Sequence, residues 1–123
     1  LASILASCDL LVHPGDQVTF GLVVLEARAC CIPVVGMAAG GVTELVDDDV
    51  GLLVRPGSAS LLADAIHDVF ESERALLGAN ARRKVLEKYD WRLIIPQLIA
   101  QYASLFASRQ RAELEAGLSY ATE

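Results

Sequence analysis

The sequence predicts an α/β fold in which a parallel sheet of about three strands is followed by C-terminal helices. Short apolar runs alternate with loops and helical stretches in residues 1–60, which also contain most of the Pro-Gly and Gly-Gly turn signals. The second half has few turn residues and carries apolar side chains at helical spacing. Strands that are separated by helices normally pair in parallel, through right-handed crossovers.

Three short apolar runs are the expected strands. The run 9–13 ends at a Pro-Gly pair, the run 33–37 is rich in valine, and the run 51–54 ends at a second Pro-Gly pair. Short apolar runs bounded by turn residues are typical of buried strands.

The helices are expected from apolar spacing and from capping residues. Thr19 is the expected N-cap of the helix that follows the first strand, and Asp90 that of the last helix. Pro96 lies early in that last helix, where it is either tolerated in the first turns or causes a kink. The expected helical ranges are 1–7, 20–30, a short turn at 43–46, 60–71, 74–88 and 91–109, followed from residue 110 by a polar helical extension or frayed tail.

Length and composition limit the class of protein. With 123 residues and 54% hydrophobic residues, the chain suits one modest globular domain and not a disordered segment. A net charge of −6 argues against a nucleic-acid partner. Three unevenly spaced cysteines and the lack of a signal peptide favour a cytoplasmic location. Because the chain begins at Leu1 and its only methionine is Met37, either the initiator is removed or the chain is a piece of a longer protein.

The loop between the first expected strand and the following helix is the first candidate binding site. Ligands of open parallel sheets bind at the carboxyl ends of strands, and free N–H groups at a helix N-terminus favour phosphate. Gly21 would let a ligand approach the backbone of Leu22 and Val23 closely. Glu26, further along the same helix, could accept two hydroxyl hydrogen bonds, as from a ribose. Taken alone, the pattern is weak, because a glycine near a helix start and an exposed helical glutamate are common.

The order of several segments adds a more specific signal. Residues 20–27 (FGLVVLEA), followed by 32–35 (IPVV), 40–46 (GGVTELV) and 51–54 (GLLV), closely resemble the retaining nucleotide-sugar glycosyltransferases of family 4. The resemblance covers roughly residues 1–106, and residues 107–123 would be a polar helical extension or tail. It implies that residues 1–106 are part of a Rossmann-like C-terminal domain, one half of the GT-B architecture, which binds the nucleotide-sugar donor.

The resemblance also implies an activity and a set of donor-binding residues. The family reaction is the transfer of a sugar, typically a hexose, from a nucleotide diphosphate sugar with retention of configuration and with neither metal nor cofactor. Phe20, Gly21, Leu22 and Val23 would lie at the donor phosphates and sugar, and Glu26 at the ribose. Gly40 and Gly41, with Glu44, have two interpretations: a donor-facing loop, or a tight turn before a helix whose first turn favours an acid.

Other parts of the family machinery would lie upstream of this span. They are the acceptor-binding N-terminal domain, the base-binding region and the basic phosphate clamp, which neither Arg28 nor Arg55 matches. Any peripheral membrane contact would also come from these missing parts. We therefore expect the chain alone to transfer no sugar. The alternative is a non-catalytic, degenerate fragment that binds a nucleotide weakly or acts only as an interaction module.

Four positions depart from the family pattern. Val18 stands where the family has the first of two glutamates, so no catalytic residue is intact, and Asp16 or Gln17 could substitute only in a different register. Arg28 occupies a usually apolar position, which leaves a surface arginine or a buried one open. Cys31 replaces a glycine in a left-handed conformation at the helix end. Asp49 replaces a turn glycine, and together these departures suggest relaxed constraint.

We expect structural roles for the remaining candidate residues. His13, at a strand end, is more often structural than a ligand, and the adjacent Cys30 and Cys31 form no metal set with the two histidines. The basic cluster 82–84 is expected to be a solvated helix face. The apolar stripe of the last helix, residues 94–106, would pack on its own domain or dock on the missing one.

Overall fold

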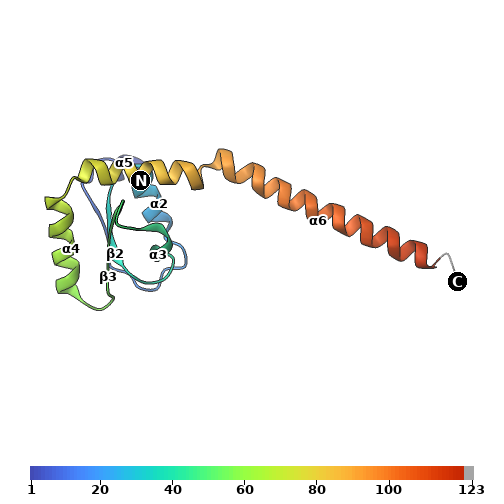
Figure 1. The fold of residues 1–123 in the computed structure, drawn as a ribbon, viewed down its shortest axis with the longest axis horizontal. Helices are drawn as coiled ribbons and strands as arrows, with labels where there is room; N and C mark the ends of the chain where they lie inside the picture. The colour runs from blue at the N-terminus through green and yellow to red at the C-terminus, as the bar shows by residue number, and fades with distance from the viewer. Residues whose placement is uncertain (121–123) are drawn as a thin grey trace. The chain divides into compact units, whose positions relative to one another are not determined.

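The structure, a computed structural model, describes the backbone of residues 1–120 and the side chains of residues 1–111. It divides into two compact units, one formed by residues 1–87 and one that begins at residue 88 (Figure 1). The predicted boundary at residues 106 and 107 stays a prediction. The elements in chain order are α1 (Ala2–Leu5), β1 (Leu11–His13), α2 (Leu22–Ala29), β2 (Val34–Met37), α3 (Val42–Leu45), β3 (Gly51–Val54), α4 (Ala59–Glu71), α5 (Arg74–Tyr89) and α6 (Trp91–Tyr120).

The sheet has three strands in the order β1-β2-β3, and both strand pairs are parallel. Val34 of β2 lies opposite Leu11 of β1 on one side and opposite Gly51 of β3 on the other. All four residues of β2 are buried. The predicted parallel sheet of about three strands is therefore confirmed.

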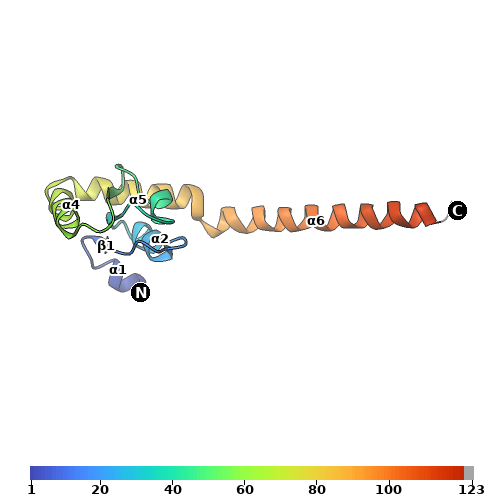
Figure 2. The same cartoon turned by 90° about the horizontal axis from the view of Figure 1, so that it is seen from below.

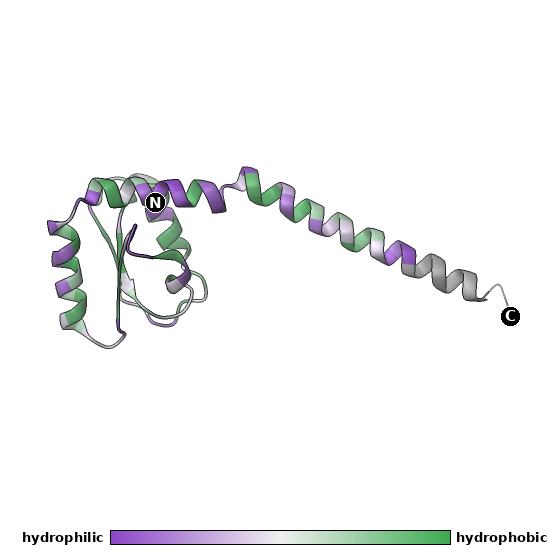
Figure 3. Ribbon diagram, in the orientation of Figure 1, coloured by the Kyte–Doolittle hydropathy of each residue, from purple (hydrophilic) through white to green (hydrophobic). Residues whose placement is uncertain are grey.

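Helices cover both faces of the sheet, as Figures 1 and 2 show. On one face, Val35 packs in a core cluster with Ala65 and Val69 of α4. On the other face, α2 contacts β1 and β2, and α3 contacts β2. Figure 3 shows hydrophobic residues on the side of α4 that faces the strands and hydrophilic residues on its other side, the pattern of an amphipathic helix.

Helix α2 begins two residues later than predicted. Gly21 is its N-cap with φ 92°, and no side chain caps this helix start. The prediction of Thr19 as the N-cap is therefore wrong, because the left-handed glycine separates Thr19 and Phe20 from the helical backbone. Ser58, in contrast, caps α4 by accepting the backbone N–H of Leu61 at 3.3 Å.

The carboxyl end of α2 closes in a Schellman motif. Cys31 has φ 62°, the N–H of Ile32 donates to the carbonyl of Ala27 at 3.0 Å, and the N–H of Cys31 donates to the carbonyl of Arg28 at 3.1 Å. Ile32 and Ala27 also share a core cluster with Leu5, which is the apolar contact typical of this motif. The structure thus places Cys31 in the left-handed conformation predicted for it.

Helix α5 passes very close to this end of α2. A Cβ on Gly78 would overlap the carbonyl oxygen of Cys31, so only glycine allows the two backbones to approach this closely. Arg82, one turn further along α5, donates to the carbonyl of Ala29. The carboxyl end of α2 is therefore held by groups of α5.

The second unit consists mainly of α6, which continues to Tyr120 with Pro96 inside it. Asp90 caps the helix start, because its Oδ1 accepts the backbone N–H of Arg92 at 2.8 Å, as predicted. Considered by itself, α6 contains no buried side chain among residues 91–111. The helix extends well beyond the predicted end near residue 109, so the polar extension is helical as far as residue 120.

Candidate functional site

Two glycine-containing loops meet at the carboxyl edge of the sheet. The N–H of Gly41 donates to the carbonyl oxygen of Val18 at 2.9 Å, which joins the loop after β1 to the loop after β2. Gly40 has φ 54°, and a Cβ there would overlap the same carbonyl. A Cβ on Gly41 would lie 2.5 Å from the Cα of Phe20. Glycines at these two positions let the loops touch.

The start of α2 lies at this junction. The first helical hydrogen bond runs from the N–H of Val24 to the carbonyl of Gly21 at 2.9 Å, so the amides of Leu22 and Val23 precede the bonded ladder. Such amides, together with the helix dipole, attract an anion. Gly21 supplies the left-handed backbone of this helix start, and the position of its absent Cβ is surrounded by the side chains of Leu45, Val24 and Val18.

The structure brings together four of the seven predicted donor residues and places the others along α2. Phe20, Gly21, Gly40 and Gly41 lie at the junction of the loops, where the Phe20 side chain is 37% exposed. Leu22 is exposed and Val23 half-buried in the first turn. Glu44 lies in the first turn of α3, as the tight-turn interpretation requires, which leaves the donor-facing interpretation of this loop a prediction.

Glu26 lies one helical turn beyond Leu22 and is exposed. It lines a pocket of about 170 Å³ together with Leu1, Leu5 and Cys30, among other residues. Its carboxylate is therefore accessible, and its predicted role at a ribose stays a prediction.

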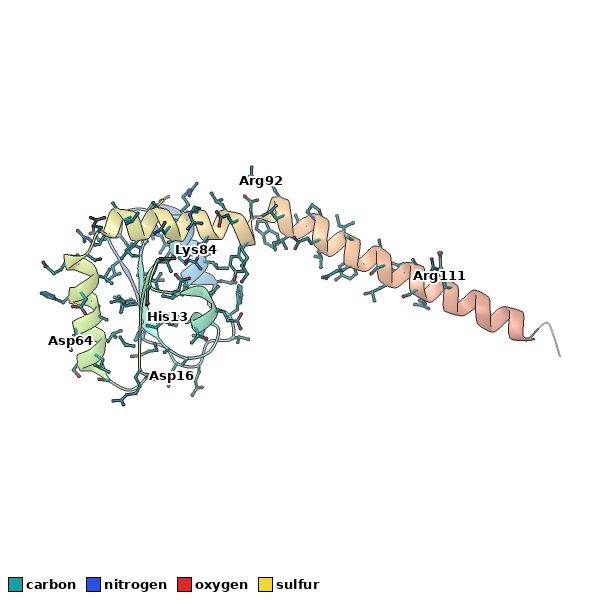
Figure 4. The ribbon with its side chains drawn as sticks, in the orientation of Figure 1. His13, Asp16, Asp64, Lys84, Arg92 and Arg111 are labelled. Atoms are coloured by element: carbon teal, nitrogen blue, oxygen red, sulfur yellow. The ribbon has the colours of Figure 1, made fainter. Side chains whose placement is uncertain are left out.

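Val18 and His13 surround Gly15. The Val18 side chain lies 3.6 Å from the Cβ position of Gly15 and 3.7 Å from that of Gly21, so it fills the space between the two glycines. The ring of His13 lies 3.1 Å from the Cβ position of Gly15. Figure 4 shows His13 beside the strands and Asp16 on the outer loop. The carboxylate that the family pattern would place at position 18 is replaced by an apolar contact.

Arg28 is a buried residue, and the surface reading of it is wrong. Only 4% of its surface is exposed, and its Nη1 donates to the carbonyl oxygen of Leu45 at 2.5 Å. This carbonyl belongs to the last turn of α3, where carbonyl oxygens have no N–H donor within their own helix. The sequence signal was the apolar neighbourhood of Arg28, but its partner lies 17 residues away.

The basic cluster 82–84 lies on a largely exposed helix face, as predicted, and each member also has a partner within the chain. Arg82 donates to Ala29, Arg83 pairs with Glu87 at 3.0 Å, and Lys84 pairs with both Asp47 and Asp49 at 2.8 Å.

The ion pairs change the ionisation of the Lys84 group. The hydrogen bonds that Lys84 donates to Asp47 and Asp49 raise the pKa of Lys84, and its hydrogen bond to Asp49 lowers the pKa of the Asp49 carboxyl. Asp49 occupies a position where the family pattern has a turn glycine, but its φ is not positive in the described structure. Its ion pair with Lys84 links this turn to α5.

The described part of the chain provides neither a cluster of metal-ligating residues nor a membrane-spanning helix. Among the described side chains, no three His, Cys, Asp or Glu residues lie close enough together to hold a metal ion. Within the part of the chain that the structure covers, none of the helices has the length and apolar character needed to cross a bilayer.

Comparison with protein families and curated proteins supports the glycosyltransferase resemblance. Residues 1–88 match the family described as Glycosyl transferases group 1. The chain is 38% identical over 117 residues to D-inositol 3-phosphate glycosyltransferase of Geodermatophilus obscurus, covering 91% of this chain and 26% of that protein. It is 37% identical over 117 residues to GDP-mannose-dependent alpha-mannosyltransferase of Corynebacterium glutamicum, covering 93% and 28%. The chain thus spans only about a quarter of the length of these relatives.

Solved structures agree with the fold. HepE of Anabaena in complex with UDP is 34% identical, with a TM-score of 0.77, over 82% of this chain and 29% of that chain. Sucrose-phosphate synthase of Thermosynechococcus elongatus is 35% identical, with a TM-score of 0.81, over 85% and 27%. The α/β fold expected for part of a GT-B glycosyltransferase is confirmed, and the chain belongs to the group 1 glycosyltransferases.

Proposed function

We propose that this chain is the donor-binding part of a retaining family 4 glycosyltransferase, from the C-terminal half of the whole enzyme. It would bind a nucleotide diphosphate sugar, and a separate N-terminal domain would supply the acceptor site. A solved C-terminal domain of a glycosyl transferase group 1 family protein (LpcC) from Francisella tularensis, 32% identical over 72% of this chain, supports this placement. HepE, solved with UDP and with UDP-glucose, supports a nucleotide-sugar ligand.

The observation that carries the proposal is the junction of the two glycine loops beside the uncapped start of α2. The Gly41–Val18 hydrogen bond fixes the loops, and no side chain caps the first-turn amides of α2. A diphosphate would accept hydrogen bonds from the amides of Leu22 and Val23, and the helix dipole would stabilise its charge. No metal is needed for this mode of binding.

Glu26 would hold the ribose one turn further along the helix. A carboxylate accepts two hydroxyl hydrogen bonds at once, which suits the 2′ and 3′ hydroxyls of a ribose. This contact orients the donor, so that its sugar lies toward Phe20 and the Gly40–Gly41 loop.

Val18 favours the alternative function, a non-catalytic module that binds a nucleotide and transfers nothing. A valine cannot accept hydroxyl hydrogen bonds from the sugar or stabilise positive charge near the reacting carbon. Loss of such a polar contact would cost about two decades or more in rate. The chain alone is therefore expected to bind donor without turnover.

Titration of the purified chain with UDP, GDP and their sugar conjugates tests donor binding. We expect a dissociation constant in the millimolar range or below. It can be measured by calorimetry or from the amide chemical-shift changes of residues 20–23 and 40–41. The Glu26→Ala variant should weaken binding about tenfold, by loss of a hydrogen bond to a charged group. Asp64→Ala, which removes an exposed carboxylate on α4, is the matched control and should bind as the unsubstituted chain does.

Two results would contradict the proposal. One is the absence of any binding at millimolar nucleotide, and the other is an equal loss in the Glu26 and Asp64 variants. Turnover of a sugar nucleotide by the isolated chain would contradict the predicted inactivity.

Val18→Glu distinguishes the two functions. If the position faces the donor sugar, the new carboxylate should increase affinity for UDP-glucose relative to UDP by a few-fold, through added hydroxyl contacts. An unchanged ratio of the two affinities would mean that position 18 does not contact the sugar.

A further inference from the structure

We infer that Arg28 is a positioning residue that holds the two loops of the donor site in register; the inference rests on the proposed function. Arg28 itself lies in the last turn of α2, away from the loops. Its effect on them would pass through Leu45.

Leu45 is in contact with both ends of α2. Its carbonyl oxygen accepts the hydrogen bond from Arg28 Nη1 at 2.5 Å. Its side-chain Cδ1 lies 3.5 Å from the Cβ position of Gly21, and Leu45 is only 2% exposed. Arg28 therefore fixes the residue whose side chain packs beneath the start of the helix.

The same contact completes a closed ring of links. Helix α2 connects Gly21 to Arg28, and the hydrogen bond connects Arg28 to Leu45. Helix α3 leads from Leu45 back to Gly41, whose N–H donates to Val18 at 2.9 Å, three residues before Gly21. Two hydrogen bonds thus close the ring, one at the loops and one at Arg28.

Helix α3 is too short to be stable without contacts to other elements. It has four residues, and its only acidic first-turn residue, Glu44, is exposed. A single turn is not stable without outside contacts. The guanidinium hydrogen bond is charge-assisted and buried, which makes it stronger than a neutral hydrogen bond at the surface.

The chain offers a matched control for Arg28. Arg82 also donates from a guanidinium to a backbone carbonyl, but its acceptor is Ala29, at the end of α2 remote from the loops. Loss of either arginine removes an arginine–carbonyl hydrogen bond, and of these two bonds the one made by Arg28 belongs to the ring.

Hydrogen exchange of the full 123-residue chain tests the link without ligand. In Arg28→Met, exchange of the Gly41 amide should accelerate about tenfold or more relative to the Leu11 amide, which bonds to Pro33 and reports on the sheet. In Arg82→Met, the Gly41 amide should keep its rate relative to Leu11. Equal acceleration of both amides in Arg28→Met, or none, would overturn the inference.

UDP affinity provides the functional readout. Arg28→Met should weaken UDP binding about tenfold, whereas Arg82→Met should lower thermal stability and leave the affinity unchanged. Binding that Arg28→Met leaves unchanged would overturn the positioning role alone. Absence of UDP binding by the unsubstituted chain would overturn the proposed function, and the positioning role with it.

Arg28→Lys keeps the test valid if the methionine variant does not fold. Lysine retains a charged donor but lacks the planar guanidinium, so this variant should show a smaller acceleration of Gly41 exchange than Arg28→Met, still selective relative to Leu11, and a smaller loss of UDP affinity. A lysine variant that folds and shows global destabilisation without a selective effect on Gly41 would also overturn the inference.

Discussion

At its carboxyl end, helix α2 is closed by groups of the chain itself, whereas its amino end is left without a side-chain cap. Cys31 and Ile32 donate to the last carbonyls, and Arg82 donates to Ala29. At the amino end, Gly21 begins the helix with neither a hydroxyl nor a carboxylate. The starts of α4 and α6, in contrast, are capped by Ser58 and Asp90. The comparison shows that α2 is closed at its carboxyl end and has no side-chain cap at its amino end, the open end, where we propose that the donor phosphate binds.

A substitution that disrupts the closed carboxyl end of α2 should cause the larger loss of stability. Gly78→Ala places a methyl group against the carbonyl of Cys31 and forces α5 away from α2, which should destabilise the fold by about 3 kcal/mol. Chemical denaturation measures the loss. Ala79→Ser, at the exposed neighbouring position, is the control, and a similar loss there would refute the close-approach explanation.

A substitution in the loop beside the open amino end of α2 should change both nucleotide binding and the stability of the fold. Gly40→Ala adds a Cβ against the Val18 carbonyl at a residue with φ 54°, so it should destabilise the fold by about 2 kcal/mol and weaken nucleotide binding at least about tenfold. Calorimetric titration with UDP is the measurement. Gly57→Ala also has a positive φ but has no atom within 4 Å, so it should lose stability only.

Cys31 allows the closed end to be improved. Cys31→Gly removes the cost of a side chain at φ 62° and should stabilise the fold by about 1 kcal/mol. Cys31→Ala separates loss of the thiol from relief of the backbone. Thermal unfolding should rank glycine above alanine, and equal stabilities would show that the left-handed residue carries no strain.

The capped start of α6 gives the smallest effect and a pH signature. The side-chain hydrogen bond with Arg92 lowers the pKa of Asp90 to about 2, below its ordinary value of 3.8. Because the folded pKa is the lower one, the cap contributes fully above about pH 4 and is lost as the pH falls toward 2. NMR should show the first turn of α6 fraying over this range, and Asp90→Asn should make its helicity independent of pH there.

The sequence could predict the elements whose determinants are local. The strands follow from short apolar runs, the left-handed Cys31 from its place after a helix, and the cap at Asp90 from its position before Trp91. The predicted cap at Thr19 was wrong because the φ of Gly21 ends the helical geometry before Thr19 is reached.

The missed features depend on partners distant in the chain. Nothing near Arg28 in the sequence indicates that Leu45 accepts its hydrogen bond, and nothing near Lys84 points to Asp47 and Asp49. The loops of the candidate site meet at the hydrogen bond between Gly41 and Val18. The sequence could identify the glycines of these loops, but it could not predict that the loops touch. The roles of the predicted donor residues stay predictions.

The strand order also has a kinetic consequence. Residues 38–50 separate β2 from β3, while residues 14–33 separate β1 from β2. Closing the shorter connection costs about 0.4 kcal/mol less in chain entropy, and β3 also gains contacts with α4. We expect β2, β3 and α4 to assemble first during folding and β1 to join them afterwards. The loop after β1, which carries half of the candidate site, would then be the last part of the sheet edge to acquire its native form.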